Sequence, residues 1–275
     1  EAAQRGLPPS YLPQFLDLGD AGPDEGKCQE LFDSGAVTIV RLPYKEGHGR
    51  GESRMLFDEV LDPETLLFMP NLGRISIWDG DDRVEWSCKH TKRKAKFAKR
   101  ASAACKSLEV LSVSKGTERR DWLVASKSIR ATDEDRKSEG WEGIEELGAS
   151  VAIPWHPKEE RLRSEWPRKV CAYYSTEADT GCGIIFHGDF KTTHTRKVIE
   201  AAASPTTAVE GMLVEVSAAL AADIATLGPK EVNALVHLLG MGSASAGYGN
   251  QLRIAVLGGI GSVPILKMHG KGELS

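Results

Sequence analysis

The sequence contains no apolar run that approaches the roughly 20 residues of a membrane-spanning helix. Its first twenty residues also lack the cationic and apolar regions of a secretory signal, so we expect a cytoplasmic protein without a membrane anchor. The five cysteines are odd in number, widely spaced and without a C-x-x-C pair, which argues against a redox dithiol and agrees with a reducing compartment. Because there is no initiator methionine, we expect a fragment or a processed product.

Motifs of the common catalytic classes are lacking too. There is no Gly-x-Ser-x-Gly elbow and no Cys-His-Asn spacing for nucleophilic catalysis. The formal net charge of -4 is small for 275 residues, so no field of the whole protein favours nucleic acid or a membrane. His187 and Asp189 share a strand face on which His194 or Cys182 could complete a metal site, but such sets recur by chance and we assign no metal.

The composition, 41% hydrophobic and 27% charged, is that of a globular protein. Periodic apolar residues predict helices over 25–32, 201–227 and 230–239, and a helical turn within 61–72. Strand-type runs followed by helices favour an α+β or α/β fold, with a mixed sheet, covering helices and a helical C-terminal segment. The predicted strands cover residues 36–43, 74–78, 83–88, 108–113, 121–126, 150–155, 171–174, 183–187 and 253–257.

The stretch 170–200 is the most informative part of the chain. Its pattern predicts a strand, a glycine-containing turn, a second strand, and a polar loop that brings Thr195 and Arg196 to the start of a helix. Such an arrangement can hold a charged side chain out toward a ligand. The alternative is a plain β-hairpin and connector, with Arg196 a solvated cation.

The most basic stretch, residues 89–100 (KHTKRKAKFAKR), could follow a phosphate backbone. Its only aromatic residue is Phe97, however, and it has no zinc-finger or helix-turn-helix spacing. A solvated hairpin tip or linker is the simpler interpretation, and nucleic-acid binding stays open as an alternative.

Four separated segments occur in the order and approximate spacing seen in sacsin-like proteins. These proteins join a Bergerat-fold (GHKL) ATPase lobe, related to the ninety-kilodalton heat-shock chaperones, to a following α/β transducer domain. The resemblance covers roughly residues 35–230 and implies the end of an ATPase lobe followed by its transducer. The segments are residues 39–44 (IVRLPY), 64–78 (ETLLFMPNLGRISIW), 150–155 (SVAIPW) and 172–199 (AYYSTEADTGCGIIFHGDFKTTHTRKVI).

The resemblance implies a role for Arg196. In the chaperone relatives a Ser-Arg at the start of a transducer helix reaches the terminal phosphate of ATP, and Thr195-Arg196 stands at the matching place. Arginine suits this task because it is permanently charged and can direct two donors at phosphate oxygens. Lys191 and His194 would assist from the same loop, and Thr38 resembles a late nucleotide-contacting threonine of the ATPase lobe, although Val37 replaces the expected glycine.

Other ATPase motifs are missing from the chain. The helix Glu-x-x-x-Asn-Ala-x-Asp-Ala, which holds the base and the magnesium ligand, has no intact counterpart, because the segment around Asn233 carries Pro229 and Val236 at the key places. We therefore expect ATP and Mg²⁺ to be held mainly by sequence outside this chain, in the ATPase lobe of the same protein. Client proteins are further partners that the resemblance implies, and a homodimer stays open.

Three regions follow from these interpretations. Residues 1–45 would be a remnant of the ATPase lobe, 46–204 the transducer-like domain, and 205–275 a helical segment with a tail. The glycine-rich loop 44–53 marks the first boundary. The implied function is part of an ATP-dependent chaperone-like or conformational-switch protein; the alternatives are a nucleic-acid-binding module and a non-catalytic interaction domain.

Overall fold

The computed structural model describes residues 62–69, 71–79, 82–91, 97–138, 140–159, 161–163, 168–195, 197–240 and 247–261, together with Gly26, Gln29, Glu30 and Asp33. The chain divides into two compact units, residues 1–54 and 55–275. In the first unit the four described residues are helical. Three of them lie in the predicted helix 25–32, and Asp33 follows it directly. The predicted strand 36–43, the loop 44–53 and Thr38 lie outside the described residues.

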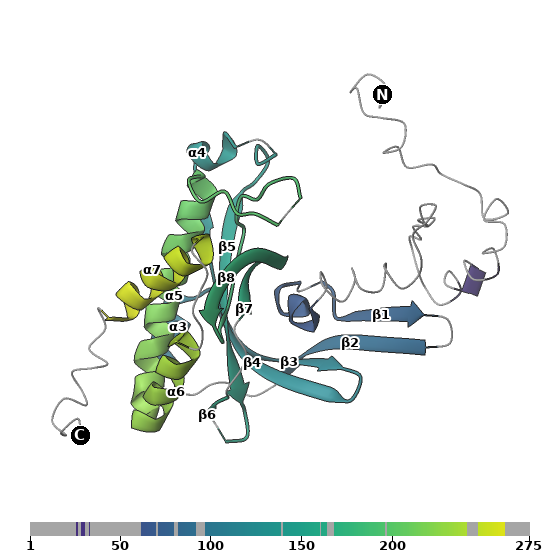
Figure 1. Cartoon of the computed structure of the whole chain (residues 1–275), viewed down its shortest axis with the longest axis horizontal. Helices are drawn as coiled ribbons and strands as arrows, with labels where there is room; N and C mark the ends of the chain where they lie inside the picture. The colour runs from purple at the N-terminus through teal and green to yellow at the C-terminus, as the bar shows by residue number, and fades with distance from the viewer. Residues whose placement is uncertain are drawn as a thin grey trace. The chain divides into compact units, whose positions relative to one another are not determined.

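The second unit is built on a nine-stranded mixed sheet (Figure 1). Eight strands follow one another in the order β1-β2-β3-β4-β5-β9-β7-β8, and β6 pairs with β5 beside this path. Neighbouring strands are antiparallel except β7 and β9, which run parallel. The strands are β1 (Arg74–Asp79), β2 (Asp82–Thr91), β3 (Ser107–Lys115), β4 (Glu118–Arg130), β5 (Glu146–His156), β6 (Arg161–Leu162), β7 (Arg168–Ala172), β8 (Tyr174–Cys182) and β9 (Ile185–Gly188).

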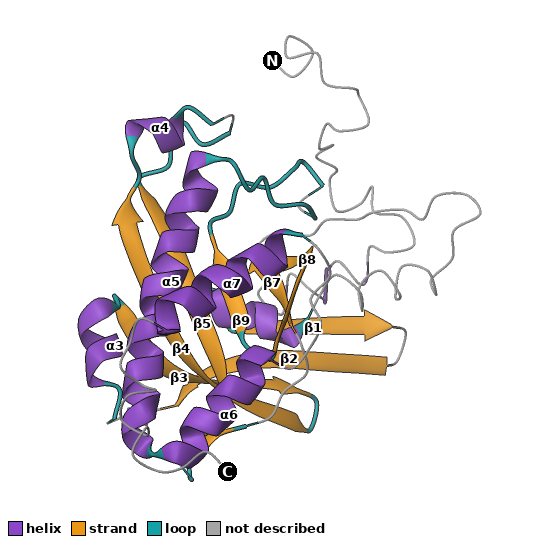
Figure 2. Ribbon diagram, turned by 60° about the vertical axis from the view of Figure 1, so that its left-hand side comes forward, coloured by secondary structure: helices purple, strands orange, loops and turns teal. Residues whose placement is uncertain are grey.

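Helices cover one face of the sheet (Figure 2). The long helix α5 packs across β4 and β5, α7 crosses α5 and lies on β8, and α3 packs against α5. The opposite face carries the 3-10 helix η4. This arrangement confirms the predicted mixed sheet with covering helices. The helical elements are η4 (Pro63–Phe68), α3 (Lys99–Ala104), α4 (Asp133–Arg136), α5 (Ser204–Ile224), η5 (Ala225–Leu227), α6 (Pro229–Gly240) and α7 (Tyr248–Gly261).

The central strands are apolar on both faces, which explains their nearly continuous hydrophobic runs. In β4, Leu123 faces the helices, whereas Trp122 and Val124 face η4. In β9, Phe186 faces the helices and Ile185 faces η4. The larger core therefore lies between the sheet and the helices, and a smaller one lies under η4.

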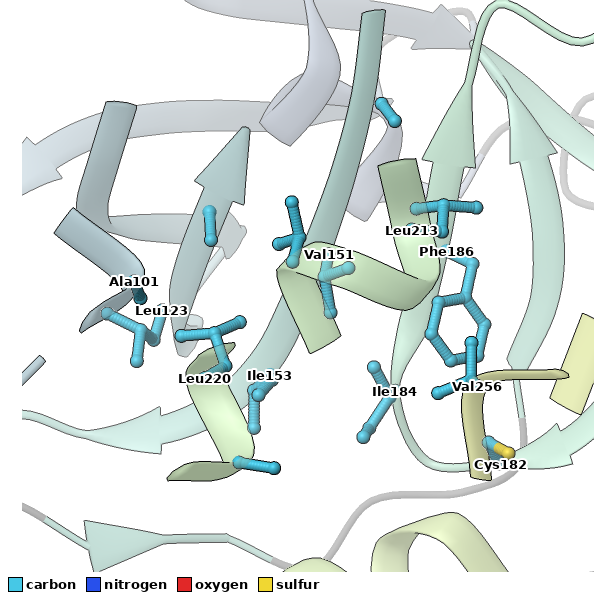
Figure 3. Close-up of a cluster of buried hydrophobic side chains, with 14 of the residues drawn as sticks. Ala101, Leu123, Val151, Ile153, Cys182, Ile184, Phe186, Leu213, Leu220 and Val256 are labelled. Atoms are coloured by element: carbon cyan, nitrogen blue, oxygen red, sulfur yellow. The ribbon is translucent and has the colours of Figure 1, made fainter. Parts of the chain in front are cut away.

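Figure 3 shows part of the larger core, where Leu213 of α5 lies beside Phe186 and where Val256 of α7 approaches Ile184 and Cys182. Helix α7 comes close enough to its neighbours to need glycine. A Cβ on Gly249 would lie 2.2 Å from the carbonyl oxygen of Asp179 in β8, and one on Gly259 would lie 2.4 Å from Cγ1 of Val214 in α5. The two glycines thus permit the close approach of α7 to the sheet and to α5.

Two of the strand predictions were wrong. Residues 253–257 form part of α7 rather than a strand, because a short apolar run beside glycines does not distinguish the two states. The predicted strand 171–174 is interrupted at Tyr173, where the chain reverses, and the turn expected after Tyr174 is instead strand β8, whose buried Thr176 and Thr180 pack into the sheet. Strand β5 is longer at both ends than the predicted strand 150–155, from Glu146 to His156, and its Trp155 pairs with Leu162 of β6. The other strands predicted within the described residues are present, as are both long helices and the helical turn, now η4.

Within the described residues, every helix is too short or too polar to cross a membrane.

Candidate functional site

The loop between β9 and α5 holds most of the residues implicated by the sequence. Two buried apolar residues anchor it, Phe190 at its start and Ile199 near its end. A β-bridge joins Thr192 to Ile199, and the amide of Thr193 donates to the carbonyl of Val198 at 2.9 Å. The loop therefore closes on itself and carries His194, Thr195 and Lys197 at its tip.

Contacts to two other elements fix the base and the side of this loop. The amide of Lys191 donates to the Thr206 hydroxyl of α5 at 3.2 Å. The amide of Glu177 in β8 donates to the carbonyl of Lys197 at 2.8 Å. The position of the tip relative to the sheet is therefore set by the backbone.

The structure places the predicted site residues unequally. His194 and Thr195 are exposed at the tip, and Lys191 is half-buried at the base. The hydroxyls of Thr193 and Thr195 are 3.0 Å apart. Arg196 lies outside the described residues, between the exposed residues Thr195 and Lys197.

The helix predicted to start at Thr195 and Arg196 begins instead at Ser204, so this prediction was wrong. β-Branched threonines favour extended backbone over helix, and Pro205 occupies the first turn, where proline is tolerated. His194 and Thr195 therefore lie in the connection that precedes α5 and not at the N-terminus of a helix. The dipole of α5 is not available to assist the tip, because its effect is confined to the first turn.

Asp189 joins three elements at the root of the loop. Its Oδ2 accepts a hydrogen bond from the Gly148 amide of β5 at 2.6 Å, and its Oδ1 accepts one from the Tyr173 hydroxyl at 2.9 Å. Its own amide donates to the Gly148 carbonyl at 2.9 Å. Burial raises the pKa of this carboxyl, although both hydrogen bonds favour the charged form.

Tyr173 occupies the sharp turn between β7 and β8. Its φ of 64° lies in the left-handed region, which is uncommon for a tyrosine. The register pairs Ala172 with Tyr174, so this one residue reverses the chain. Burial, and then the charge of Asp189, raises the pKa of the phenol to about 12, so the hydroxyl stays a donor at neutral pH.

His187 lies beside this pair and is buried. Its ring stacks on Phe68 with centroids 4.2 Å apart and an interplanar angle of 4°, and the Tyr173 ring meets it edge-on at 5.1 Å. Burial lowers the pKa of the imidazole to about 3, so the ring is neutral at physiological pH.

The residues considered as metal ligands do not converge. Cys182 lies in the helix-side core, where its thiol approaches the Leu239 carbonyl at 3.3 Å, whereas His187 lies on the opposite face. In the part of the chain that the structure describes, no three histidine, cysteine, aspartate or glutamate side chains gather as a metal site would require.

A second polar cluster lies at the other end of η4, beside a cavity of about 440 Å³. Arg168 of β7 contacts Asp62 at 3.1 Å and Glu64 at 3.6 Å, and its guanidinium lies 5.5 Å from the Trp122 ring centroid. Arg120 of β4 contacts Glu64 at 3.1 Å. Sequence reasoning missed this cluster; the Asp-Pro pair at 62–63 signals a helix start but not its arginine partners.

The two carboxyls of this cluster titrate in opposite directions. Burial, and then the neighbouring Asp62, raises the pKa of Glu64 to about 8 despite both arginines. Burial alone would raise the pKa of Asp62 too, but the hydrogen bonds from Glu64 and the charge of Arg168 outweigh it and lower that pKa. The surroundings of the pair therefore favour the protonated form of Glu64 and the charged form of Asp62.

The basic stretch 89–100 divides between two elements. Lys89, His90 and Thr91 end β2, and Lys99 and Arg100 begin α3; residues 92–96 lie outside the described residues. His90 Nδ1 lies 2.5 Å from Glu109 Oε2. The described part of the stretch is thus sheet and helix rather than a free hairpin tip.

Comparisons with family models, with curated proteins and with solved structures gave no match for this chain.

Proposed function

We propose that this chain is the transducer-type part of an ATP-driven chaperone-like or conformational-switch protein of the cytoplasm. The loop 191–200 would present Arg196 to the terminal phosphate of a nucleotide held by an ATPase lobe elsewhere in the protein. Lys191, His194 and Thr195 would assist from the same loop. One observation carries the proposal. The loop is closed by the bridge between Thr192 and Ile199 and is held by a bond from β8, and its sequence places cationic and hydroxyl side chains at the tip.

The physical argument concerns positioning. Phosphoryl transfer gains most from charge and donors that are fixed before charge develops on the phosphate oxygens. The bonds to Thr206 and from Glu177 fix the loop through backbone atoms of Lys191 and Lys197, without using the side chains at its tip. The tip is therefore open to a phosphate, and any movement of the sheet relative to the nucleotide would carry it along.

The test is ATP turnover by the full-length gene product carrying Arg196→Ala. We expect a loss of at least a hundredfold in kcat with nucleotide affinity little changed, since the arginine would act mainly in the transition state. Lys197→Ala is the matched control, because it removes a neighbouring exposed cation from the same loop. Equal turnover by the wild type and Arg196→Ala would contradict the proposal.

A nucleic-acid-binding role for residues 89–100 is the alternative from the sequence. It predicts binding of DNA or RNA at low salt that weakens steeply with salt and is lost on neutralising Lys92, Arg93, Lys96 and Lys99. If no binding occurs at low salt, that alternative is removed. An interaction domain without nucleotide would show neither turnover nor this salt dependence.

A further inference from the structure

A groove of about 620 Å³ runs beside η4 on the face of the sheet opposite the helices. One wall is apolar and comes from η4 and the residues after it. The floor crosses β3, β4, β5 and β9. Its volume falls in the range of ligand-binding clefts. The wall residues are Leu66, Leu67, Phe68, Met69 and Leu72, and the floor includes Glu109, Leu111, Val124, Ser126, Ser150 and His187.

His187 is the residue that points to a ligand. It is 6% exposed, and within the described structure neither of its ring nitrogens has a hydrogen-bond partner. A neutral imidazole carries one donor and one acceptor, and buried polar groups are nearly always paired. The stack on Phe68 fixes the ring plane, so the two nitrogens cannot turn elsewhere without breaking that contact.

Hydroxyl groups continue the polar floor beside this ring. The strand register pairs His187 with Ser150, and Ser150 with Ser126. The two serine hydroxyls are 2.8 Å apart, so one bond between them leaves a further donor available. A row of donors and acceptors therefore crosses β4, β5 and β9.

The ionisable groups at the rim already have partners. His90 contacts Glu109, and Lys106 contacts Glu146 at 2.8 Å. Asp189 is held by Tyr173 and Gly148. A charged ligand would lose water and have to compete with these partners, so the groove favours a neutral group that both donates and accepts.

We propose that this groove binds an extended, uncharged peptide segment, with apolar side chains against the η4 wall and a backbone amide at His187 and the serine pair. A peptide bond is neutral and offers one donor and one acceptor. The four strands of the floor span about 14 Å at the usual strand spacing, which is the length of about four extended residues. The inference is independent of the nucleotide, and this chain alone suffices to test it.

The experiment titrates the chain with a pool of blocked hexapeptides that carry leucine, valine or phenylalanine at alternate positions and serine between them. With ¹⁵N-histidine label, the ring signals of His187, assigned by their absence from His187→Phe, should shift saturably. By fluorescence anisotropy His187→Phe, which keeps a ring on Phe68, should bind at least tenfold more weakly. His237→Phe, the same change on the exposed side of α6, should bind as the wild type does.

Three results would overturn the proposal. The first is the absence of any ring shift at millimolar peptide. The second is binding that does not respond to the change made. Either His187→Phe binds the apolar pool as tightly as the wild type does, or the wild type binds a pool with lysine or aspartate in place of the apolar residues as tightly as the apolar pool. The third is a shift that depends on chain concentration without peptide, which would make a second copy of the chain the occupant. Should His187→Phe fail to fold, the comparison of the apolar pool with the charged pool on the wild type decides between these outcomes.

Discussion

The carboxylate of Asp223 in α5 caps helix α3 from 122 residues away. Its Oδ2 accepts from the Ala101 amide at 2.8 Å, and its Oδ1 accepts from the Arg100 amide at 3.0 Å. These amides are the second and third of the helix, and Ala98 at the N-cap position has no polar side-chain atom that could accept from them. A six-residue helix thus depends on a tertiary cap.

Replacing this cap should destabilise the fold. We expect Asp223→Ala to lower the free energy of unfolding by about 2–4 kcal/mol, because the variant leaves two amides unpaired next to the fully buried Ala101. Urea denaturation monitored by tryptophan fluorescence measures this change. Glu215→Ala is the control on the same helix, since it removes only the half-exposed pair with Lys127 and should cost less than about 1 kcal/mol. Similar losses in both variants would contradict the capping role.

The proton on Glu64 should make stability depend on pH. Its folded pKa is about 8, above the ordinary value of 4.5, so between these values the folded state keeps a proton that the unfolded state has lost. Stability should therefore fall as pH rises through this window. Glu64→Gln cannot titrate, and by pH 8 it should be more stable than the wild type by on the order of a few kcal/mol.

Unfolding by urea at pH 5, 6.5 and 8 measures this difference. Glu118→Gln removes one charge from the exposed rim of the same cavity and controls for the change in net charge. Parallel pH profiles of the wild type and Glu64→Gln would show that Glu64 does not hold the proton. The effect of Asp62 on stability has the opposite dependence on pH. Because its folded pKa is lowered, the charged carboxylate stabilises the fold above its ordinary pKa, and this stabilisation is lost as pH falls through the lowered pKa.

Much of the sheet could be predicted because its central strands are apolar on both faces. Leu123 and Val124 belong to different cores, and so do Ile153 and Ala152, so the runs remain hydrophobic whichever face is considered. The polar clusters could not be predicted, because tertiary packing alone brings their members together. Arg168 and Asp62 are 106 residues apart, and nothing local distinguishes this arginine from other surface cations.

His187 and Asp189 show how far sequence reasoning reached at the site. Their shared strand face suggested metal ligands, whereas in the structure one stacks on Phe68 and the other holds Tyr173 and Gly148. Phe68, Tyr173 and Gly148 all come from other parts of the fold than β9. The strained φ of Tyr173 has no local signature either, because neither glycine nor asparagine marks the turn.

The root of the loop 191–200 should depend on Asp189. We expect Asp189→Ala to lower the free energy of unfolding by about 2–3 kcal/mol, since the Gly148 amide and the Tyr173 hydroxyl lose their acceptor. Tyr173→Phe should cost only about 1 kcal/mol, because it removes one of these bonds. Hydrogen exchange of the Thr193 and Glu200 amides, which close the loop, should rise more in Asp189→Ala. Unchanged protection there would show that the loop is held independently of Asp189.

Two glycines of α7 should respond to alanine in opposite ways. A Cβ on Gly249 would lie 2.2 Å from the Asp179 carbonyl oxygen, and backbone cannot yield as a flexible side chain can, so Gly249→Ala should destabilise by several kcal/mol or displace α7 from β8. A Cβ on Gly258 meets nothing within 4 Å, so Gly258→Ala should stabilise by about 0.5–1 kcal/mol through helix propensity. Thermal unfolding of the two variants measures both effects. If Gly249→Ala unfolded at the wild-type temperature, helix α7 could not lie as close to β8 as described.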